Sequence, residues 1–296
     1  TEAVQYTALS HDAKQLYYIT EKNGEYVLWQ REQQEKYNFS LPQQVFSSPS
    51  EMRDISLSKD AKAILYVGTE YDVKGDIYLF DFSTQQHRRL TGRQAEEGAP
   101  IFTADGKHIF FHQRSPGQNN YRIFKLAIAN PTDSLIEIKL TRDAMSPALT
   151  QDGSRLAFIS RDKHSQGDLF VYDFNQQTIE ALTDSPAIIL SPVWADDGDT
   201  LYVSQIELDT NQDQVINNHD RSALYQWRYA ARDEQVFALP ITFTRYFAWQ
   251  PQVVSGGIYF LSNIRANIQL FSLPLSGALS ARIDISQYQQ QLSVLK

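Results

Sequence analysis

One short segment recurs five times along the sequence at nearly constant intervals, and this repeat constrains the fold more than any other feature. Each copy has an apolar residue, a small or polar pair, an Asp followed by Gly or Ala, and an apolar run. The copies are 9-LSHDAKQLYYIT-20, 57-LSKDAKAILYVG-68, 102-FTADGKHIFFHQ-113, 149-LTQDGSRLAFIS-160 and 194-WADDGDTLYVSQ-205. Their aspartates, Asp12, Asp60, Asp105, Asp152 and Asp197, lie 45 to 48 residues apart. A sixth, eroded copy is 253-VVSGGIYFLSN-263.

Each copy is followed by a second apolar or alternating run that is typical of a β-strand. Three units add a third run that ends in Leu-Thr, and a short segment containing Pro precedes most of the Asp turns. Each unit therefore contains about four strands joined by tight turns. The second runs are 24-GEYVLWQ-30, 75-GDIYLFDF-82, 121-YRIFKLAI-128, 167-GDLFVYDF-174, 222-SALYQWRY-229 and 267-NIQLFSLPL-275.

Four-stranded antiparallel units that repeat every ~40–50 residues are characteristic of β-propellers. The sequence therefore predicts an all-β fold, a six-bladed β-propeller of four-stranded antiparallel blades. A β-sandwich or two small β domains would not explain the sustained period. No linker or shift in composition divides the chain, so we expect a single domain over 1–296. Residues 281–285 are the expected outer strand of the sixth blade, and the Gln-rich tail 286–296 has weak helical character.

The repeated Asp residues are expected to be structural. An Asp before Gly in a hairpin turn usually accepts hydrogen bonds from its own backbone and tolerates unusual dihedral angles. A catalytic site needs one constellation of side chains rather than five copies of one turn. The carboxylate pairs Glu96–Glu97 and Asp196–Asp197 are likewise assigned to turns, where solvated acids are expected.

The repeat resembles that of the TolB-like (WD-like) six-bladed β-propeller family. The segment 147-PALTQDGSRLAFISRDKHSQGDLFVYDFNQQTIEALT-183 matches the family pattern best, and the resemblance covers about residues 7 to 275. It implies a role in protein binding or scaffolding without naming a partner. The chain departs from the family's larger members because it contains neither an amino-terminal α/β domain nor a hydrolase domain with a G-x-S-x-G motif.

One stretch, 209-DTNQDQVINNHD-220, does not belong to the repeat. It is predicted to be an insertion at 206–222 in the fifth blade. Oxygen-bearing side chains fall on positions 1, 3, 5, 9 and 12 of this stretch, and position 7 would offer its backbone carbonyl. This spacing matches the calcium-loop template, in which alternating residues of a tight loop direct hard oxygen ligands inward. The predicted calcium ligands are Asp209, Asn211, Asp213, Val215, Asn217 and Asp220.

Two positions depart from that template. Position 6, usually Gly because the turn needs an open backbone angle, is Gln214, which costs ~1 kcal/mol. The closing residue, Asp220, is shorter than the usual Glu, and the stretch resembles dockerin-type calcium loops more than cytosolic EF-hands. A solvated hairpin tip and a site for magnesium or another ion stay open as alternatives.

Composition limits the remaining possibilities. The formal net charge is −8 and no basic run appears, which argues against binding to nucleic acids or anionic membranes. The chain has no Cys, so disulfides and thiol chemistry are excluded. His108 and His112 are four residues apart on one strand and would share a face, but no third zinc ligand accompanies them.

The sequence thus predicts a non-enzymatic, calcium-binding propeller that acts as a protein-interaction or scaffold domain in the bacterial periplasm or outside the cell. We expect a protein partner, no nucleic acid and no direct membrane insertion by this chain. One alternative is a sensory, ligand-binding domain of a membrane-anchored regulator. Another is a hydrolase or lyase that uses the central channel near Thr103, Ala148, Trp194 and Gln252.

Overall fold

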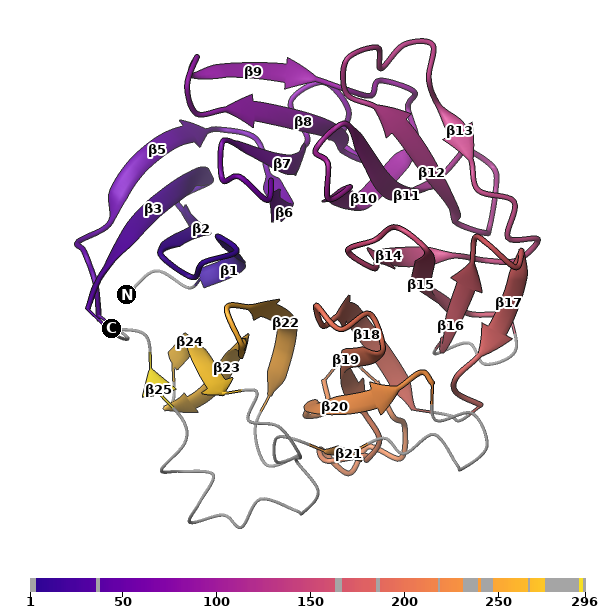
Figure 1. Ribbon diagram of the computed structural model, residues 1–296. Helices are drawn as coiled ribbons and strands as arrows, with labels where there is room; N and C mark the ends of the chain where they lie inside the picture. Colours follow the sequence, from indigo (N-terminus) through magenta and orange to yellow (C-terminus); the bar gives the residue numbers. More distant parts are fainter. Residues whose placement is uncertain are drawn as a thin grey trace. The chain divides into compact units, whose positions relative to one another are not determined.

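The structure is a computed structural model that describes residues 4–35, 38–162, 167–184, 187–217, 219–230, 239–240, 247–265, 267–274 and 293–294. These residues form six antiparallel sheets, five of four strands and one of five, and contain no helix (Figure 1). The predicted fold class, a six-bladed all-β propeller, is confirmed. The chain divides into two compact units, Thr1–Pro147 and Ala148–Lys296, so the predicted single domain stays a prediction.

The first unit contains three blades, each built from strands that are consecutive in the chain. Blade 1 has β1 (Val4–Leu9), β2 (Gln15–Lys22), β3 (Glu25–Glu35), β4 (Asn38–Phe39) and β5 (Gln43–Ser48). Blade 2 has β6 (Met52–Leu57), β7 (Ala63–Gly68), β8 (Asp76–Asp81) and β9 (Gln86–Arg89). Blade 3 has β10 (Glu96–Phe102), β11 (His108–Arg114), β12 (Arg122–Ala127) and β13 (Ile136–Glu137).

The second unit follows the same plan, and its boundary with the first falls inside β14. Blade 4 has β14 (Met145–Leu149), β15 (Arg155–Ser160), β16 (Asp168–Asp173) and β17 (Thr178–Ala181). Blade 5 has β18 (Ile188–Trp194), β19 (Thr200–Ile206), β20 (Ala223–Arg228) and β21 (Leu239–Pro240). Blade 6 has β22 (Ala248–Val254), β23 (Gly257–Arg265), β24 (Asn267–Pro274) and β25 (Ser293–Val294).

The outer strand of blade 6 comes from an unexpected part of the sequence. Residues 281–285, predicted to form it, lie outside the described residues. The strand that pairs with β24 is β25, with Phe271 opposite Val294. It lies in the Gln-rich tail, so the helical tendency assigned to that tail is wrong at these two residues.

The recurring Asp turns have the structural role that was predicted. In four of the five, a Ser or Thr two residues earlier donates its hydroxyl to the Asp carboxylate, as Thr150 does to Asp152 at 2.6 Å. The backbone N–H two residues later donates to the same carboxylate, as Ser154 does at 3.0 Å. The residue after each Asp adopts a left-handed conformation, with φ +73° at Gly153 and +55° at Ala61. Gly is therefore favoured there because it has no Cβ.

The first strand of most blades contains a bulge at the Pro-containing segment. Non-Gly residues with φ near +50° occur at the same place in five blades, and four of them precede a proline. The strand register shifts there, as between Gly98 and Ile101 in β10. Proline is tolerated in a strand at such a bulge because no ladder hydrogen bond is needed from it. The left-handed residues are Asp54, Ala99, Ser146, Ser191 and Gln250.

The hydrophobic core lies between facing sheets. In the first unit, one cluster joins apolar side chains of β7 and β8 to those of β11 and β12, including Leu65, Ile109 and Phe111, which are fully buried. Arg53 and Asp54 of β6 add polar interactions between blades 2 and 3: the Arg53 guanidinium donates to the Glu97 carbonyl at 3.0 Å, and Asp54 accepts from the Ala99 N–H at 3.1 Å. The described part of the chain contains no helix long and apolar enough to span a membrane.

Candidate calcium loop

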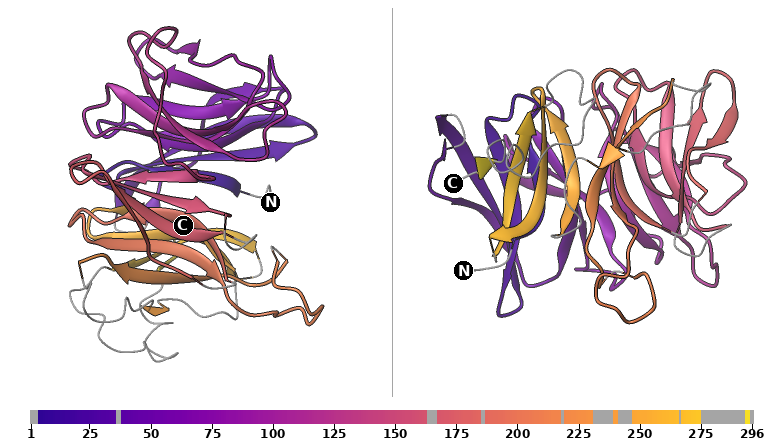
Figure 2. Two further views of the ribbon diagram at one scale, coloured as in Figure 1. Left: turned by 90° about the vertical axis from the view of Figure 1, so that its right-hand side faces the viewer. Right: turned by 90° about the horizontal axis from the view of Figure 1, so that it is seen from below.

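The predicted insertion is a loop that joins β19 to β20 in blade 5. It runs from Glu207 to Ser222 and extends beyond the ends of these strands, as the orange loop of Figure 2 shows. The equivalent connection in blade 2, between β7 and β8, spans only residues 69–75. Strands rather than helices enter and leave the loop, so its conformation depends on its own side chains.

Asp220 joins the two ends of the loop through hydrogen bonds to its carboxylate. Its side chain is fully buried, and its Oδ1 atom accepts hydrogen bonds from the backbone N–H groups of Thr210 at 2.7 Å and Asn211 at 3.1 Å. The Thr210 hydroxyl donates to the same oxygen at 3.1 Å, and Oδ2 accepts from the Asn217 N–H at 3.0 Å. These donors, led by the Asn217 amide, lower the pKa of the Asp220 carboxyl. Asp220 therefore ties the two ends of the loop together as a carboxylate.

The first half of the loop wraps around Asp209. Its Oδ2 atom accepts from the Gln214 N–H at 2.7 Å, and its Oδ1 atom accepts from the Asp213 N–H at 3.1 Å. This wrapping requires left-handed conformations at Gln212, with φ +63°, and at Gln214, with φ +71°. The open backbone angle expected at Gln214 is confirmed.

Asp213 lies where the predicted ligands converge. The side-chain amides of Asn211 and Asn217 each donate to Asp213 Oδ2, at 3.1 Å in both cases. The Asn217 amide also donates to the Val215 carbonyl, at 3.2 Å. The side-chain N–H groups of Asn217 thus lie between the Asp213 carboxylate and the Val215 carbonyl. A cation would be attracted to the same place by these two oxygens.

The loop brings together Asp209, Asn211, Asp213, Val215 and Asn217, whereas the Asp220 oxygens are directed to backbone amides of the loop. No three His, Cys, Asp or Glu side chains in the described residues form a group that could hold a metal ion. Because the oxygen set is completed by amides and a carbonyl, it suits a hard cation and not a zinc-type ion. Calcium binding itself stays a prediction.

The other sequence candidates have structural partners. His112 is half-buried, and its Nδ1 atom accepts from the Ser146 N–H at 3.2 Å. Burial lowers the pKa of His112 to about 4, so its ring is neutral at physiological pH. Three of the channel residues make contacts within the fold: the Thr103 hydroxyl donates to Asp105 at 2.6 Å, and the Trp194 indole donates to the Ala148 carbonyl at 3.1 Å.

Sequence reasoning missed the environment of Glu97. The Glu96–Glu97 pair was assigned to a turn, but β10 begins at Glu96, and Glu97 is only 1% exposed. Burial raises the pKa of Glu97 to about 8, and the Thr91 hydroxyl, which donates to Oε2, acts against this rise. The nearby carboxylates of Asp76 and Asp72 raise it further. The assignment of Glu97 to a solvated turn is therefore wrong.

Comparison with known proteins supports the fold. No known family model matches the sequence, and no curated protein matches it. Among solved structures, the chain is similar to TolB from Acinetobacter baumannii, with a TM-score of 0.63 and 19% identity over 80% of this chain and 56% of that one. The chain thus spans little more than half of that TolB.

Two other solved structures show the same architecture. A putative TolB from Agrobacterium tumefaciens has a TM-score of 0.64 and 14% identity over 86% of this chain and 84% of that one. The β-propeller domain of the Trilobed protease from Pyrococcus furiosus has a TM-score of 0.61 and 14% identity over 95% and 86%. At such low identity the likeness establishes a TolB-like propeller fold and nothing about activity.

Proposed function

We propose that this chain is a non-enzymatic, calcium-binding β-propeller that acts as a protein-interaction or scaffold domain in the periplasm. The observation that carries the calcium part is the convergence of Asn211, Val215 and Asn217 on Asp213 within a loop closed by Asp220. The likeness to TolB structures supports the protein-interaction part and the periplasmic location.

Calcium fits this loop because the available ligands are hard oxygens at alternating positions. Asp209, Asn211 and Asp213 would supply side-chain oxygens from one side, and the Val215 carbonyl would supply one from the other. The Asn217 amide would turn its oxygen toward the ion, and Asp220 would hold the ends of the loop or bind the ion through water. The bound ion would neutralise Asp209 and Asp213, whose mutual repulsion otherwise opposes a compact loop.

Calcium titration by isothermal calorimetry tests the metal assignment. The wild-type protein should bind Ca²⁺ with a Kd of roughly 0.1–1 mM or tighter, the range of extracellular calcium modules. Asp213→Ala should weaken binding at least about tenfold. Asp133→Ala, which removes an exposed carboxylate in another blade, is the matched control and should bind as wild type does. An absence of binding heat, with the same melting temperature in calcium and in chelator, would refute the calcium assignment.

Crosslinking followed by affinity capture from periplasm tests the interaction assignment. The full chain should recover one or more proteins at stoichiometric levels, and recovery should survive mutation of exposed residues far from the contact surface. If no protein is recovered under native crosslinking, the interaction role is rejected whatever the calcium result.

A further inference from the structure

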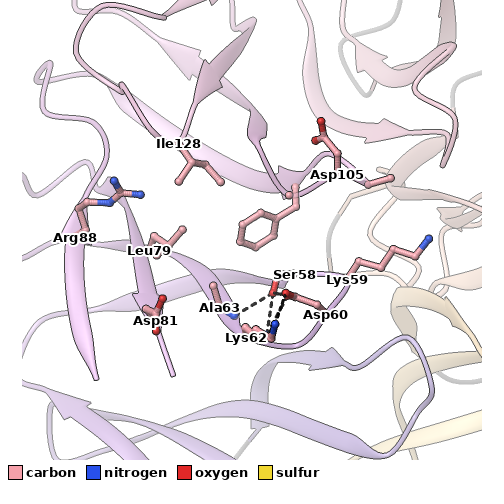
Figure 3. A pocket seen from close by; sticks show the side chains of 13 residues that line it. Ser58, Lys59, Asp60, Lys62, Ala63, Leu79, Asp81, Arg88, Asp105 and Ile128 are labelled. Atoms are coloured by element: carbon pink, nitrogen blue, oxygen red, sulfur yellow. Dashed lines mark hydrogen bonds and ion pairs between the residues drawn. The ribbon is translucent and has the colours of Figure 1, made fainter. Parts of the chain in front are cut away.

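The contact between blades 2 and 3 differs between its two ends. Where β8 and β10 finish, it is hollowed into a groove of about 570 Å³ (Figure 3), and the carboxylates there accept hydrogen bonds from their own turns, as Asp60 does from the Ser58 hydroxyl at 2.8 Å. Where β8 and β10 begin, Asp76 and Glu97 are each only 1% exposed. Water therefore does not solvate a charge on Glu97 as it does on the acids of the groove.

The corresponding positions of blades 4 and 5, each 92 residues later in the chain, have a simpler arrangement. The Thr183 hydroxyl donates to Asp168 Oδ1 at 3.0 Å, and its oxygen accepts from the Leu169 N–H at 2.8 Å. The position of Glu97 is taken by Ile189, which is also buried but carries no charge. Asp168 therefore has a Thr donor within its own blade.

In blades 2 and 3 the equivalent Thr serves a different acid. The Thr91 oxygen accepts from the Ile77 N–H at 2.8 Å, but the Thr91 hydroxyl donates to Glu97 Oε2. Because a hydroxyl has one proton to donate, Thr91 does not serve Asp76 as well. Asp76 instead lies 2.7 Å from the Arg89 guanidinium. Glu97 Oε1 has no hydrogen-bond donor among the described residues, so one oxygen of this buried carboxyl is uncompensated.

The charged groups around Glu97 favour its protonated form. Burial raises the pKa of Glu97 to about 8, and the carboxylates of Asp76 and Asp72 add to the rise. The Arg53 guanidinium donates to the main-chain carbonyl of Glu97 at 3.0 Å and to Asp54 Oδ2 at 3.0 Å. Further charged or titratable side chains of the surrounding strands have partners of their own: Arg89 with Asp76, Arg114 with Glu96, Glu51 with Arg53, and His112 with Ser146.

The first residues of β10 form a short unit of their own. The register of β10 with β11 shifts between Gly98 and Ile101, and Ala99, inside this shift, has φ +47°. Residues 91–98, which we call the entry segment, are therefore joined to the rest of β10 through a bulge, where the ladder is interrupted and the strand bends. Separation of the entry segment from blade 2 would break the bonds of Thr91 and leave the ladder from Ile101 onward in place.

We infer that the proton on Glu97 controls whether the entry segment stays packed against blade 2. With its proton, Glu97 is neutral and remains buried beside Thr91. When the segment separates, Glu97 reaches water, its O–H bond breaks, and the proton passes to the solvent. The opened form ionises with the pKa of an ordinary carboxyl, whereas the packed form has a pKa of about 8, so the population of the opened form rises with pH through this interval. This pH-dependent contact between two blades depends on neither calcium nor a partner, and so goes beyond the proposed function.

The test is amide hydrogen exchange of the full chain in roughly 0–1 M urea, which separates local opening from global unfolding because only global unfolding exposes enough surface to respond steeply to urea. The Ile77 amide, which donates to Thr91, reports the entry segment, and the Leu169 amide, with the same bond to Thr183, is the internal control. Relative to the intrinsic rate, the urea-independent exchange of Ile77 should accelerate at least about tenfold between pH 6.5 and 8, and that of Leu169 should not. In this range the packed His112 ring and the Tyr78 hydroxyl stay neutral.

Two variants assign the effect to one carboxyl. Glu97→Gln should abolish the acceleration at Ile77, because an amide has no proton to release in this range. Glu96→Gln, one residue earlier, is the matched control and should keep it, since the Tyr121 and Arg114 partners of Glu96 lower its pKa and it is ionised throughout. Exchange of Ile77 that is independent of pH, that depends on pH only with a steep urea response, or that still accelerates in Glu97→Gln would overturn the inference.

A measurement on the wild-type protein alone keeps the inference testable if Glu97→Gln does not fold. The ¹³C resonance of the Glu97 carboxyl should titrate above pH 6.5, well above the ordinary value of 4.5. A Glu97 carboxyl that titrates near the ordinary value would show that the packed form holds no proton at neutral pH, and it would overturn the inference without affecting the calcium or interaction roles.

Discussion

Replacing Glu97 by Gln should stabilise the protein at neutral pH, because the native carboxyl is buried where its charged form is poorly compensated. One oxygen, Oε2, accepts a hydrogen bond from the Thr91 hydroxyl, and the other, Oε1, has no hydrogen-bond donor among the described residues. The charged form also lies close to Asp76, which is itself buried. Gln keeps the shape and the bond from Thr91, and its amide can donate toward the neighbouring carboxylates.

The size of the effect follows from proton linkage. The pKa of Glu97 is about 8 in the folded protein, against an ordinary value of 4.5. Between these two pH values the folded state therefore keeps a proton that the unfolded state has released. Because the folded state binds more protons there, the free energy of unfolding falls as the pH rises through this window. At ~1.4 kcal/mol per pH unit, the loss approaches ~3 kcal/mol at pH 7 and ~5 kcal/mol above pH 8. The Glu97→Gln protein lacks this loss, so its advantage over wild type should grow from near zero at pH 5.

The measurement is the free energy of unfolding in urea at pH 5, 6, 7, 8 and 9, after refolding has been shown to be complete. Glu96→Gln is the matched control, with the same substitution one residue earlier. Burial alone would raise the pKa of Glu96, but the Tyr121 hydroxyl and the Arg114 guanidinium outweigh it and lower that pKa. Glu96→Gln should therefore destabilise the protein above pH 4. Parallel pH profiles for wild type and Glu97→Gln, or a less stable Glu97→Gln at pH 8, would refute the buried-acid argument.

Two further predictions concern the turns and the contacts between blades. Gly153→Ala should lower the free energy of unfolding in urea by about 1 kcal/mol. Since φ is +73° and a Cβ there meets no atom within 4 Å, this loss comes from backbone strain alone. Ala61→Gly, at φ +55°, is the control and should not destabilise the protein, and an unchanged stability of Gly153→Ala would contradict the strain argument. Asp54→Ala should cost ~2–3 kcal/mol because it removes the carboxylate that lies 3.0 Å from the Arg53 guanidinium and accepts from the Ala99 N–H. Asp54→Asn should cost less, and equal losses would show that charge does not matter there.

The propeller was predictable because its repeat depends on local chemistry. An Asp that accepts hydrogen bonds from its own turn, as Asp152 does, is specified by the residues within two positions of it, and the apolar runs on either side have the period of buried strands. The outer strand of blade 6 could not be predicted in this way. Ser293 and Val294 form only two residues of strand, and they pair with Ser272 and Phe271 of β24, which are more than 20 residues earlier, so no local pattern specifies the pairing.

The burial of Glu97 could not be predicted from the sequence either, and the reason is also physical. Glu97 lies at the start of a strand next to a second acid, a pattern that is usually solvated. Its burial follows from the packing of blade 3 against blade 2, where Asp76 of β8 approaches it from another sheet and Thr91 approaches it from the connection between β9 and β10. Residues outside β10 created this environment, and no periodicity within β10 indicates it.

The calcium loop of blade 5 also combines hydrogen bonds between neighbouring residues with hydrogen bonds between distant ones, and this combination determines which part of the loop calcium would stabilise. In the repeated turns the Asp carboxylates accept from donors two or three positions away, whereas Asp220 accepts from Thr210, ten positions earlier. The ends of the loop are therefore joined by a buried carboxylate even without an ion. Calcium would then act mainly on Asp209 and Asp213, by replacing amide donors and relieving repulsion. It should reduce hydrogen exchange at the Asp213 and Gln214 amides far more than it raises the melting temperature, and a large rise in melting temperature without that local protection would place the ion elsewhere.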